Sequence, residues 1–161
     1  MSPSTSLRVS PHVRYKNCGP RAGSARRFRV GIVVLSVIAL HVAVSAAARH
    51  VLGTTVLMLL PGVSLRVVEN HSGPFGLGPL WVSLLLGAAV LGALVLSRAR
   101  IPFLALGLIL GGGIANLAER ILTGKTTDIL VLANTTAFNT ADAAIILGLL
   151  LLLWPWRPST T

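Results

Sequence analysis

The sequence is poor in charged, aromatic and sulfur-containing residues, and each shortage excludes a class of protein. Charged residues make up 11% of the 161 positions and aromatic residues 5%, whereas 53% are hydrophobic. A soluble domain carries about 25% charged residues, so this chain has too little polar surface for a water-facing globule. The single cysteine, Cys18, excludes an internal disulfide bond and a cysteine metal site. The mean hydropathy is +0.80, and the long apolar runs predict an integral membrane protein.

Acidic residues are also scarce, and the basic residues that outnumber them gather near the N-terminus. The chain has 14 Lys and Arg against 4 Asp and Glu, and seven of the basic residues fall within residues 1–29. This stretch has almost no apolar run and is predicted to be a flexible, disordered cytoplasmic tail attracted to anionic lipid. Its aromatic residues do not alternate with the Lys and Arg residues at a spacing that would let them stack on nucleobases, so no nucleic-acid partner is expected.

Four apolar segments are each long enough to cross a bilayer as a helix. They predict an all-α membrane domain over residues 30–156, followed by a short cytoplasmic tail at 157–161, with helices at about 30–48, 80–97, 101–117 and 138–156. Arg98 and Arg100 mark a cytoplasmic turn between the second and third segments. Ten basic residues then lie on that side and four on the other, so both termini are predicted to be cytoplasmic.

The first segment has a second interpretation, as a cleaved signal peptide. Its end, Ser45–Ala48, offers the small residues that a cleavage site needs. The apolar run of 19 residues is longer than the usual signal-peptide core, which favours a retained helix.

Two connections are expected on the extracytoplasmic side. The first contains apolar, partly β-branched runs on either side of Pro61-Gly62, which predict a small β-hairpin lying on the membrane surface. The second, at about 118–137, is polar and is expected to be a connecting loop. Between them, Gly111-Gly112-Gly113 lies within an apolar segment, where small residues let helix backbones approach closely.

Two aspartates near one membrane face suggest chemistry, because a carboxylate beside lipid is costly and rarely incidental. Asp128 and Asp142 are 14 residues apart, so the intervening loop can fold back and bring them together. A close pair shares one proton, and one member can then activate water while the other protonates a leaving amine. That is the chemistry of an aspartic peptidase. The alternative is structural, with Asp142 capping the fourth helix and Asp128 a solvated loop residue.

The segments around these aspartates resemble the lipoprotein signal peptidase family, also called signal peptidase II. That family has a glycine-rich helix leading into Gly-Asn-Leu-x-Asp-Arg, then a Val-Val-Asp-Phe box, a Phe-Asn-x-Ala-Asp-Ser box and an earlier Asn-x-Gly-Ala-Ala-Phe box. The corresponding segments here are Gly111–Arg120, Thr127–Ile129, Phe138–Asp142 and Glu69–Gly76. The resemblance covers roughly residues 30–156.

The resemblance implies the site, substrate and location of the protein. Asp128 and Asp142 would be the catalytic pair, with site-shaping residues Asn70, Asn116, Arg120 and Asn139. The family's substrate is a prolipoprotein already carrying diacylglycerol on its cysteine, which is cleaved just before that cysteine without a metal or cofactor. The resemblance also implies a monomer in the bacterial inner membrane, in contact with lipid, with its site on the extracytoplasmic side.

The sequence departs from the family pattern in its first helix. The family carries Asp-x-x-Ser/Thr-Lys there, whereas His41 and Ser45 occupy those places here. Glu119 replaces the aspartate of the glycine-rich box, and Ala143 replaces the serine after the second catalytic position. Two alternatives therefore stay open: a diverged member that binds lipopeptides without cleaving them, and a small transporter that uses both aspartates as a proton relay.

Overall fold

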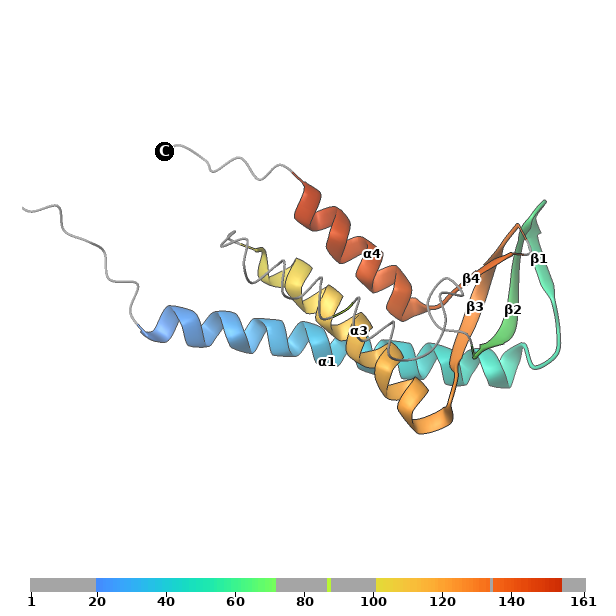
Figure 1. Cartoon of the computed structure of the whole chain (residues 1–161), viewed down its shortest axis with the longest axis horizontal. Coiled ribbons are helices and arrows are strands. Elements are labelled where there is room, and N and C mark those ends of the chain that lie inside the picture. Colours follow the sequence, from blue (N-terminus) through green and yellow to red (C-terminus); the bar gives the residue numbers. More distant parts are fainter. Residues whose placement is uncertain (1–19, 72–86, 88–100, 134, 155–161) are drawn as a thin grey trace, which may run out of the picture.

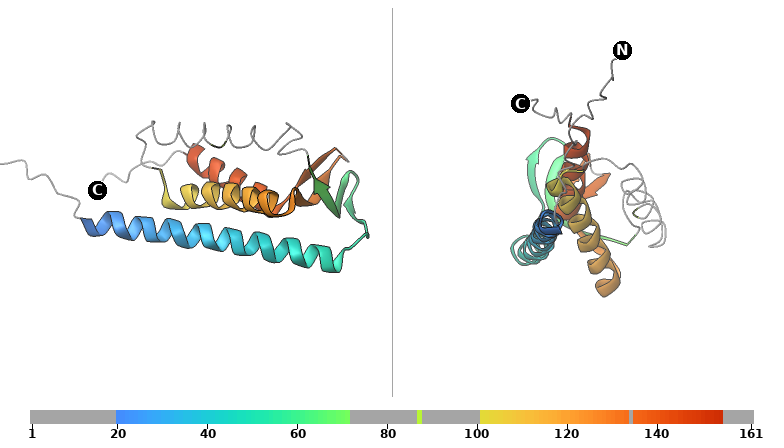
Figure 2. Two further views of the ribbon diagram at one scale, coloured as in Figure 1. Left: turned by 60° about the horizontal axis from the view of Figure 1, so that its bottom comes forward. Right: turned by 90° about the vertical axis from the view of Figure 1, so that its left-hand side faces the viewer.

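The computed structural model describes residues 20–71, 87, 101–133 and 135–154. Three helices and four strands lie in this part of the chain: α1 (Pro20–Val51), β1 (Leu57–Leu60), β2 (Val63–Asn70), α3 (Phe103–Thr123), β3 (Thr126–Leu132), β4 (Thr136–Phe138) and α4 (Thr140–Leu153). The predicted helix at 80–97 lies outside the described residues except for Gly87, and so do Cys18 and the tail at 157–161. The helices run beside one another with the sheet at one end (Figures 1 and 2).

Helix α1 is longer than its apolar run, because it begins at Pro20 and ends at Val51. The prediction of a disordered tail is therefore wrong for residues 20–29, where Ala and Arg are strong helix formers and Pro suits the first helical position. Four of its residues are buried at intervals of three or four, namely Val37, His41, Ser45 and Ala48. This spacing places them on one face of the helix.

Glycines set the close approach of the three helices. A Cβ atom added at Gly111 of α3 would lie 2.8 Å from the Cβ atom of Val37 on α1. One added at Gly112 would press into the backbone carbonyl of Ala141 on α4. The predicted packing role is thus confirmed for Gly111 and Gly112, whereas Gly113 faces open space.

The strands form one antiparallel sheet in the order β1-β2-β3-β4. The predicted hairpin around Pro61-Gly62 is confirmed by the pairing of β1 with β2. The prediction of a connecting loop at 118–137 is wrong, because α3 continues to Thr123 and both β3 and β4 follow. Strand β3 is rich in β-branched residues and pairs with β2, which places Val68 opposite Asp128 and Asn70 opposite Thr126.

The ends of α3 and α4 are fixed by local backbone chemistry. Helix α3 ends at Gly124, whose φ of 75° is a left-handed conformation that glycine adopts without strain. Helix α4 begins at Thr140 rather than 138, because Phe138 pairs with Leu130 in the sheet and Asn139 is the N-cap.

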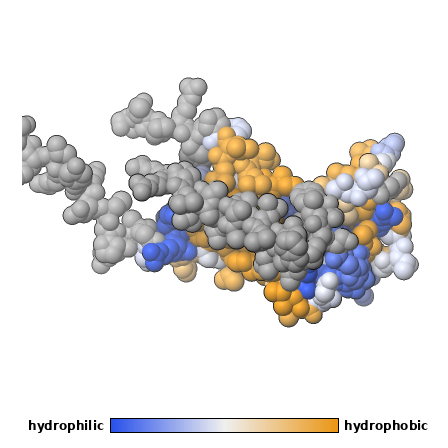
Figure 3. All heavy atoms as spheres, viewed as in Figure 1, coloured by the Kyte–Doolittle hydropathy of each residue, from blue (hydrophilic) through white to orange (hydrophobic). Residues whose placement is uncertain are grey.

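Two described helices are long and apolar enough to cross a membrane, over Ser24–Val51 and Phe103–Thr123. Helix α4 is apolar but has only 14 residues in its described part. Large apolar side chains such as Leu35 and Leu40 are more than half exposed on α1. Figure 3 shows hydrophobic residues over the middle of the helices and hydrophilic residues toward the two ends of the molecule. An exposed apolar surface of this extent marks contact with a membrane or another protein.

Candidate active site

Asp128 lies in β3 and is almost completely buried, with 1% of its surface exposed. Both of its carboxylate oxygens accept hydrogen bonds from side-chain amides. Asn70 Nδ2 of β2 donates to Oδ2 at 3.0 Å, and Asn139 Nδ2 donates to Oδ1 at 2.9 Å. Asp128 is therefore a buried acid held by two neutral donors, and the alternative of a solvated loop residue is wrong.

Asp142 lies in the first turn of α4 and forms a capping box with Asn139. The backbone N–H of Asn139 donates to Asp142 Oδ2 at 3.2 Å, and the backbone N–H of Asp142 donates to Asn139 Oδ1 at 2.9 Å. The structural alternative for Asp142, a helix cap, is confirmed. The other carboxylate oxygen accepts a hydrogen bond of 2.7 Å from Asn116 Nδ2 on α3, so the same side chain also faces a second helix.

Asn139 joins the two aspartates. Its Nδ2 group donates to Asp128 Oδ1 and, at 3.0 Å, to Asn116 Oδ1, while its Oδ1 atom accepts from the backbone of Asp142. One buried side chain thus connects β3, α3 and α4. The side chain of Asn139 holds the Asp128 carboxylate and its backbone N–H holds the Asp142 carboxylate, so one residue fixes the two acids relative to one another, as an acid–base pair requires.

The pKa of Asp128 is raised above its ordinary value of 3.8. Burial is the largest cause, because it disfavours the charged carboxylate. The hydrogen bonds from Asn70 and Asn139 act in the opposite direction, and the negative charges of Asp142 and Glu119 add to the increase. In contrast, Glu69 is exposed, and its pKa is lowered by a hydrogen bond and the positive charge of Lys125.

Arg120 lies beside the site at the end of α3, with 9% of its surface exposed. Its Nη2 group donates to Thr126 Oγ1 at 3.3 Å, and Nη1 has no hydrogen-bond partner among the described residues. Arg120 thus brings a buried positive charge whose field acts on Asp142. The site also contains a cluster in which His41 and Arg49 of α1 reach Glu119 of α3. His41 and Glu119 stand where the family pattern has aspartates, and the pattern did not point to Arg49.

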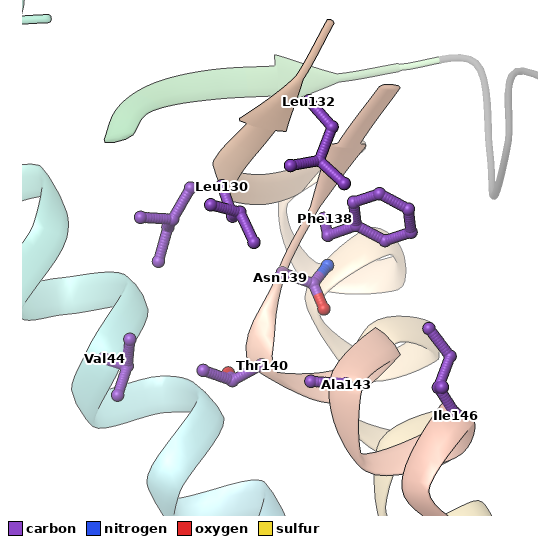
Figure 4. A pocket seen from close by; sticks show the side chains of 9 residues that line it. Val44, Leu130, Leu132, Phe138, Asn139, Thr140, Ala143 and Ile146 are labelled. Carbon is purple, nitrogen blue, oxygen red and sulfur yellow. The ribbon is translucent and has the colours of Figure 1, made fainter. Parts of the chain in front are cut away.

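An apolar cavity of about 400 Å³ lies between α1, the sheet and the start of α4 (Figure 4). Val44 of α1, Leu130 of β3, Phe138 of β4 and Ile146 of α4 line it, and Asn139 lies at its wall. A group held in this cavity would be apolar and would lie next to the residue that joins the two carboxylates. Within the described part of the chain, no three His, Cys, Asp or Glu side chains gather as a metal site would need.

Residues 31–156 match the family described as signal peptidase (SPase) II. The chain belongs to the signal peptidase II family. Signal peptidase II is a membrane aspartic peptidase, and the function of the chain is accordingly that of this family. The family assignment agrees with a structure in which two aspartates share one polar cluster beside apolar helices.

Individual relatives support the family assignment. A lipoprotein signal peptidase from Pelotomaculum thermopropionicum is 32% identical over 133 residues, which cover 76% of this chain and 88% of that protein. A lipoprotein signal peptidase from Chlorobium luteolum is 38% identical over 110 residues, covering 56% of this chain and 66% of that protein.

Two solved structures described as bacterial membrane enzymes share the fold seen here. One has a TM-score of 0.59 at 18% identity and covers 77% of this chain and 84% of its own. The other has a TM-score of 0.61 at 17% identity and covers 81% of this chain and 94% of its own.

Proposed function

We propose that the chain cleaves diacylglyceryl-modified prolipoproteins just before the lipidated cysteine, with Asp128 and Asp142 as the catalytic pair. The observation that carries the proposal is the convergence of both carboxylates on Asn139. A capping role explains the contacts of Asp142 with the start of α4, but it does not explain why a second, buried aspartate is held against the same cap.

The reaction needs a base and an acid, and the pair supplies both. One carboxylate takes a proton from a water molecule as the water oxygen attacks the scissile carbonyl carbon. The other carboxyl group is protonated and gives its proton to the cysteine nitrogen as the C–N bond breaks. The raised pKa of Asp128 supports this mechanism, because burial and the nearby negative charge of Asp142 both favour the protonated carboxyl group.

The neighbouring polar residues act as site-shaping groups in this proposal. Asn70, Asn116 and Asn139 orient the carboxylates through the hydrogen bonds described above. Arg120 has an Nη1 group without a partner among the described residues, and this buried donor suits the substrate carbonyl.

The proposed arrangement in the membrane has four spanning helices, both termini in the cytoplasm and the site at the extracytoplasmic face of the inner membrane. The sheet, which carries Asp128, lies at one end of the helices beside the start of α4, which carries Asp142 (Figure 1). This placement is consistent with a site at a membrane surface. There the acyl chains of the substrate stay among apolar groups while the scissile bond meets water. The apolar cavity beside Asn139 supports this choice of a lipid-bearing substrate. The proposed form of the protein is a monomer.

Cleavage of a synthetic diacylglyceryl prolipoprotein by the purified protein tests the proposal. The parent should release the signal peptide, whereas Asp128→Asn and Asp142→Asn should each lower kcat by about 10³-fold or more. Thermal melting in detergent checks that every variant is folded. Full activity in either aspartate variant contradicts the mechanism. A folded parent that binds but does not cleave contradicts the peptidase function and leaves a lipopeptide-binding protein.

A further inference from the structure

We propose, on the basis of the function proposed above, that His41 and Arg49 of α1 act with Glu119 of α3 as a positioning network for the two aspartates. We call these three residues the Glu119 network. None of them contacts either aspartate through a hydrogen bond described above. They contact Thr127, which directly precedes Asp128, and Thr140, which lies two positions before Asp142.

Glu119 holds the strand segment that carries Asp128. Its Oε2 atom accepts from the backbone N–H of Thr127 at 3.2 Å, and its Oε1 atom accepts from Thr127 Oγ1 at 2.7 Å. Thr127 directly precedes Asp128, and successive strand residues point to opposite faces. The carboxylate of Glu119 therefore fixes both the backbone and the side chain of the neighbouring residue while Asp128 faces its asparagine partners.

His41 connects that anchor to the start of α4. Its Nε2 atom lies 3.0 Å from Glu119 Oε2, and its Nδ1 atom lies 3.1 Å from Thr140 Oγ1. A carboxylate only accepts, so Nε2 donates to Glu119, while the Thr140 hydroxyl can either donate to Nδ1 or accept from it. Thr140 is the first residue of α4, between the N-cap Asn139 and Asp142. One imidazole thus ties the anchor of Asp128 to the helical turn of Asp142.

Arg49 completes the network from the same helix. Its Nη1 group donates to Thr127 Oγ1 at 2.8 Å and lies 3.4 Å from Glu119 Oε1. Its side chain is 48% exposed, whereas His41 is only 2% exposed. Because solvent weakens exposed ion pairs, we expect the buried His41 to contribute more to positioning than Arg49.

The test compares cleavage by the full-length parent, His41→Ala, His41→Gln and Val37→Ala in detergent. Because a small displacement of reacting groups costs up to about 100-fold, His41→Ala should lower kcat by about 10-fold to 100-fold and change KM less than about 3-fold. Glutamine keeps an N–H donor for Glu119 and should bring kcat back to within about 5-fold of the parent. Val37 packs against Gly111 on the same face of α1, so Val37→Ala should lower Tm and leave kcat within about 2-fold.

Two results overturn the positioning role. One is an unchanged kcat in His41→Ala. The other is an equal loss of kcat in Val37→Ala when both variants have the same Tm. The backbone amide resonance of Thr127 gives a second readout that does not need activity, because this amide donates to Glu119. It should move in His41→Ala and stay in place in Val37→Ala. If the parent does not cleave, the proposed function fails, but the network can still be tested by the resonance. A Thr127 resonance that does not move in His41→Ala would overturn the network.

Discussion

The side-chain amide of Asn139 donates a 2.9 Å hydrogen bond to Asp128 Oδ1, while its carbonyl oxygen accepts from the backbone of Asp142. These two roles can be separated. In Asn139→Ser the hydroxyl still caps α4, because serine is a favoured N-cap residue, but the amide donor to Asp128 is lost. We expect Asn139→Ser to keep Tm within a few degrees of the parent and to lower kcat by about 100-fold.

Asn139→Ala is the matched control for the cap. It removes both functions, so it should also lower the free energy of unfolding by about 1 kcal/mol. Unimpaired cleavage by Asn139→Ser would show that the cap alone is what the site needs from this residue.

The raised pKa of Asp128 predicts that its buried carboxylate lowers the stability of the protein increasingly as pH rises. A carboxyl group with a raised folded-state pKa contributes stability below its ordinary value of 3.8, and this contribution is lost as pH rises through the folded-state pKa. Asparagine does not titrate. The Tm of Asp128→Asn minus that of the parent should therefore increase between about pH 4 and pH 7, as measured by thermal melting in detergent.

Glu69→Gln provides the control for this pH series. The pKa of Glu69 is lowered by Lys125, so its contribution has the opposite sign: it is present above the ordinary value of 4.5 and lost as pH falls. The Tm difference for Glu69→Gln should not rise with pH. A flat or falling difference for Asp128→Asn would contradict the burial of its charge.

Gly112 and Gly113 provide a test of helix packing in adjacent positions. Gly112→Ala places a methyl group against the carbonyl of Ala141, next to Asp142, whereas Gly113→Ala points into open space. Overpacking costs about 1–3 kcal/mol, so Gly112→Ala should lower both Tm and cleavage. Gly113→Ala should leave Tm unchanged or raise it slightly, because alanine favours helices. Equal effects at the two positions would contradict the observed contact of α3 with α4.

The predicted orientation can be tested with the natural cysteine. Cys18 belongs to the predicted cytoplasmic tail, so a membrane-impermeant maleimide should label it in spheroplasts only after permeabilisation. Thr54→Cys in a Cys18→Ser background should be labelled without permeabilisation, because Thr54 is exposed between α1 and β1. The reverse pattern of labelling would place the sheet in the cytoplasm.

The sequence predicted those parts of the fold that depend on local composition. Apolar runs located the three described helices, and Pro61-Gly62 located the β1–β2 hairpin. Their ends were harder to predict, because α3 continues through the polar residues Glu119 and Arg120, which hydropathy assigns to a loop. Strands β3 and β4 were missed for a different reason. Strand β3 depends on pairing with β2, about 60 residues away in the chain, and β4 pairs in turn with β3. Alternating β-branched residues in Thr126–Leu132 were nevertheless a local signal for β3.

The residues of the candidate site also fall into those that local sequence could predict and those that it could not. Asp128, Asp142 and their asparagine partners were selected by motifs of fixed local spacing. The role of His41 depends on contacts with residues 78 and 99 positions away. Local sequence does not reveal such contacts. The signals were a polar residue within the apolar stretch of α1 and its place in the family pattern, where an aspartate is usual.

The capping box of α4 has a consequence for biogenesis. Asp142 reaches its position only when the first turn of α4 has formed, and α4 follows all the other described elements in the chain. During synthesis, Asp128 and its β-strand emerge from the ribosome before their partner aspartate. The two carboxylates are therefore brought together last, and a chain whose synthesis has not reached α4 lacks an assembled pair.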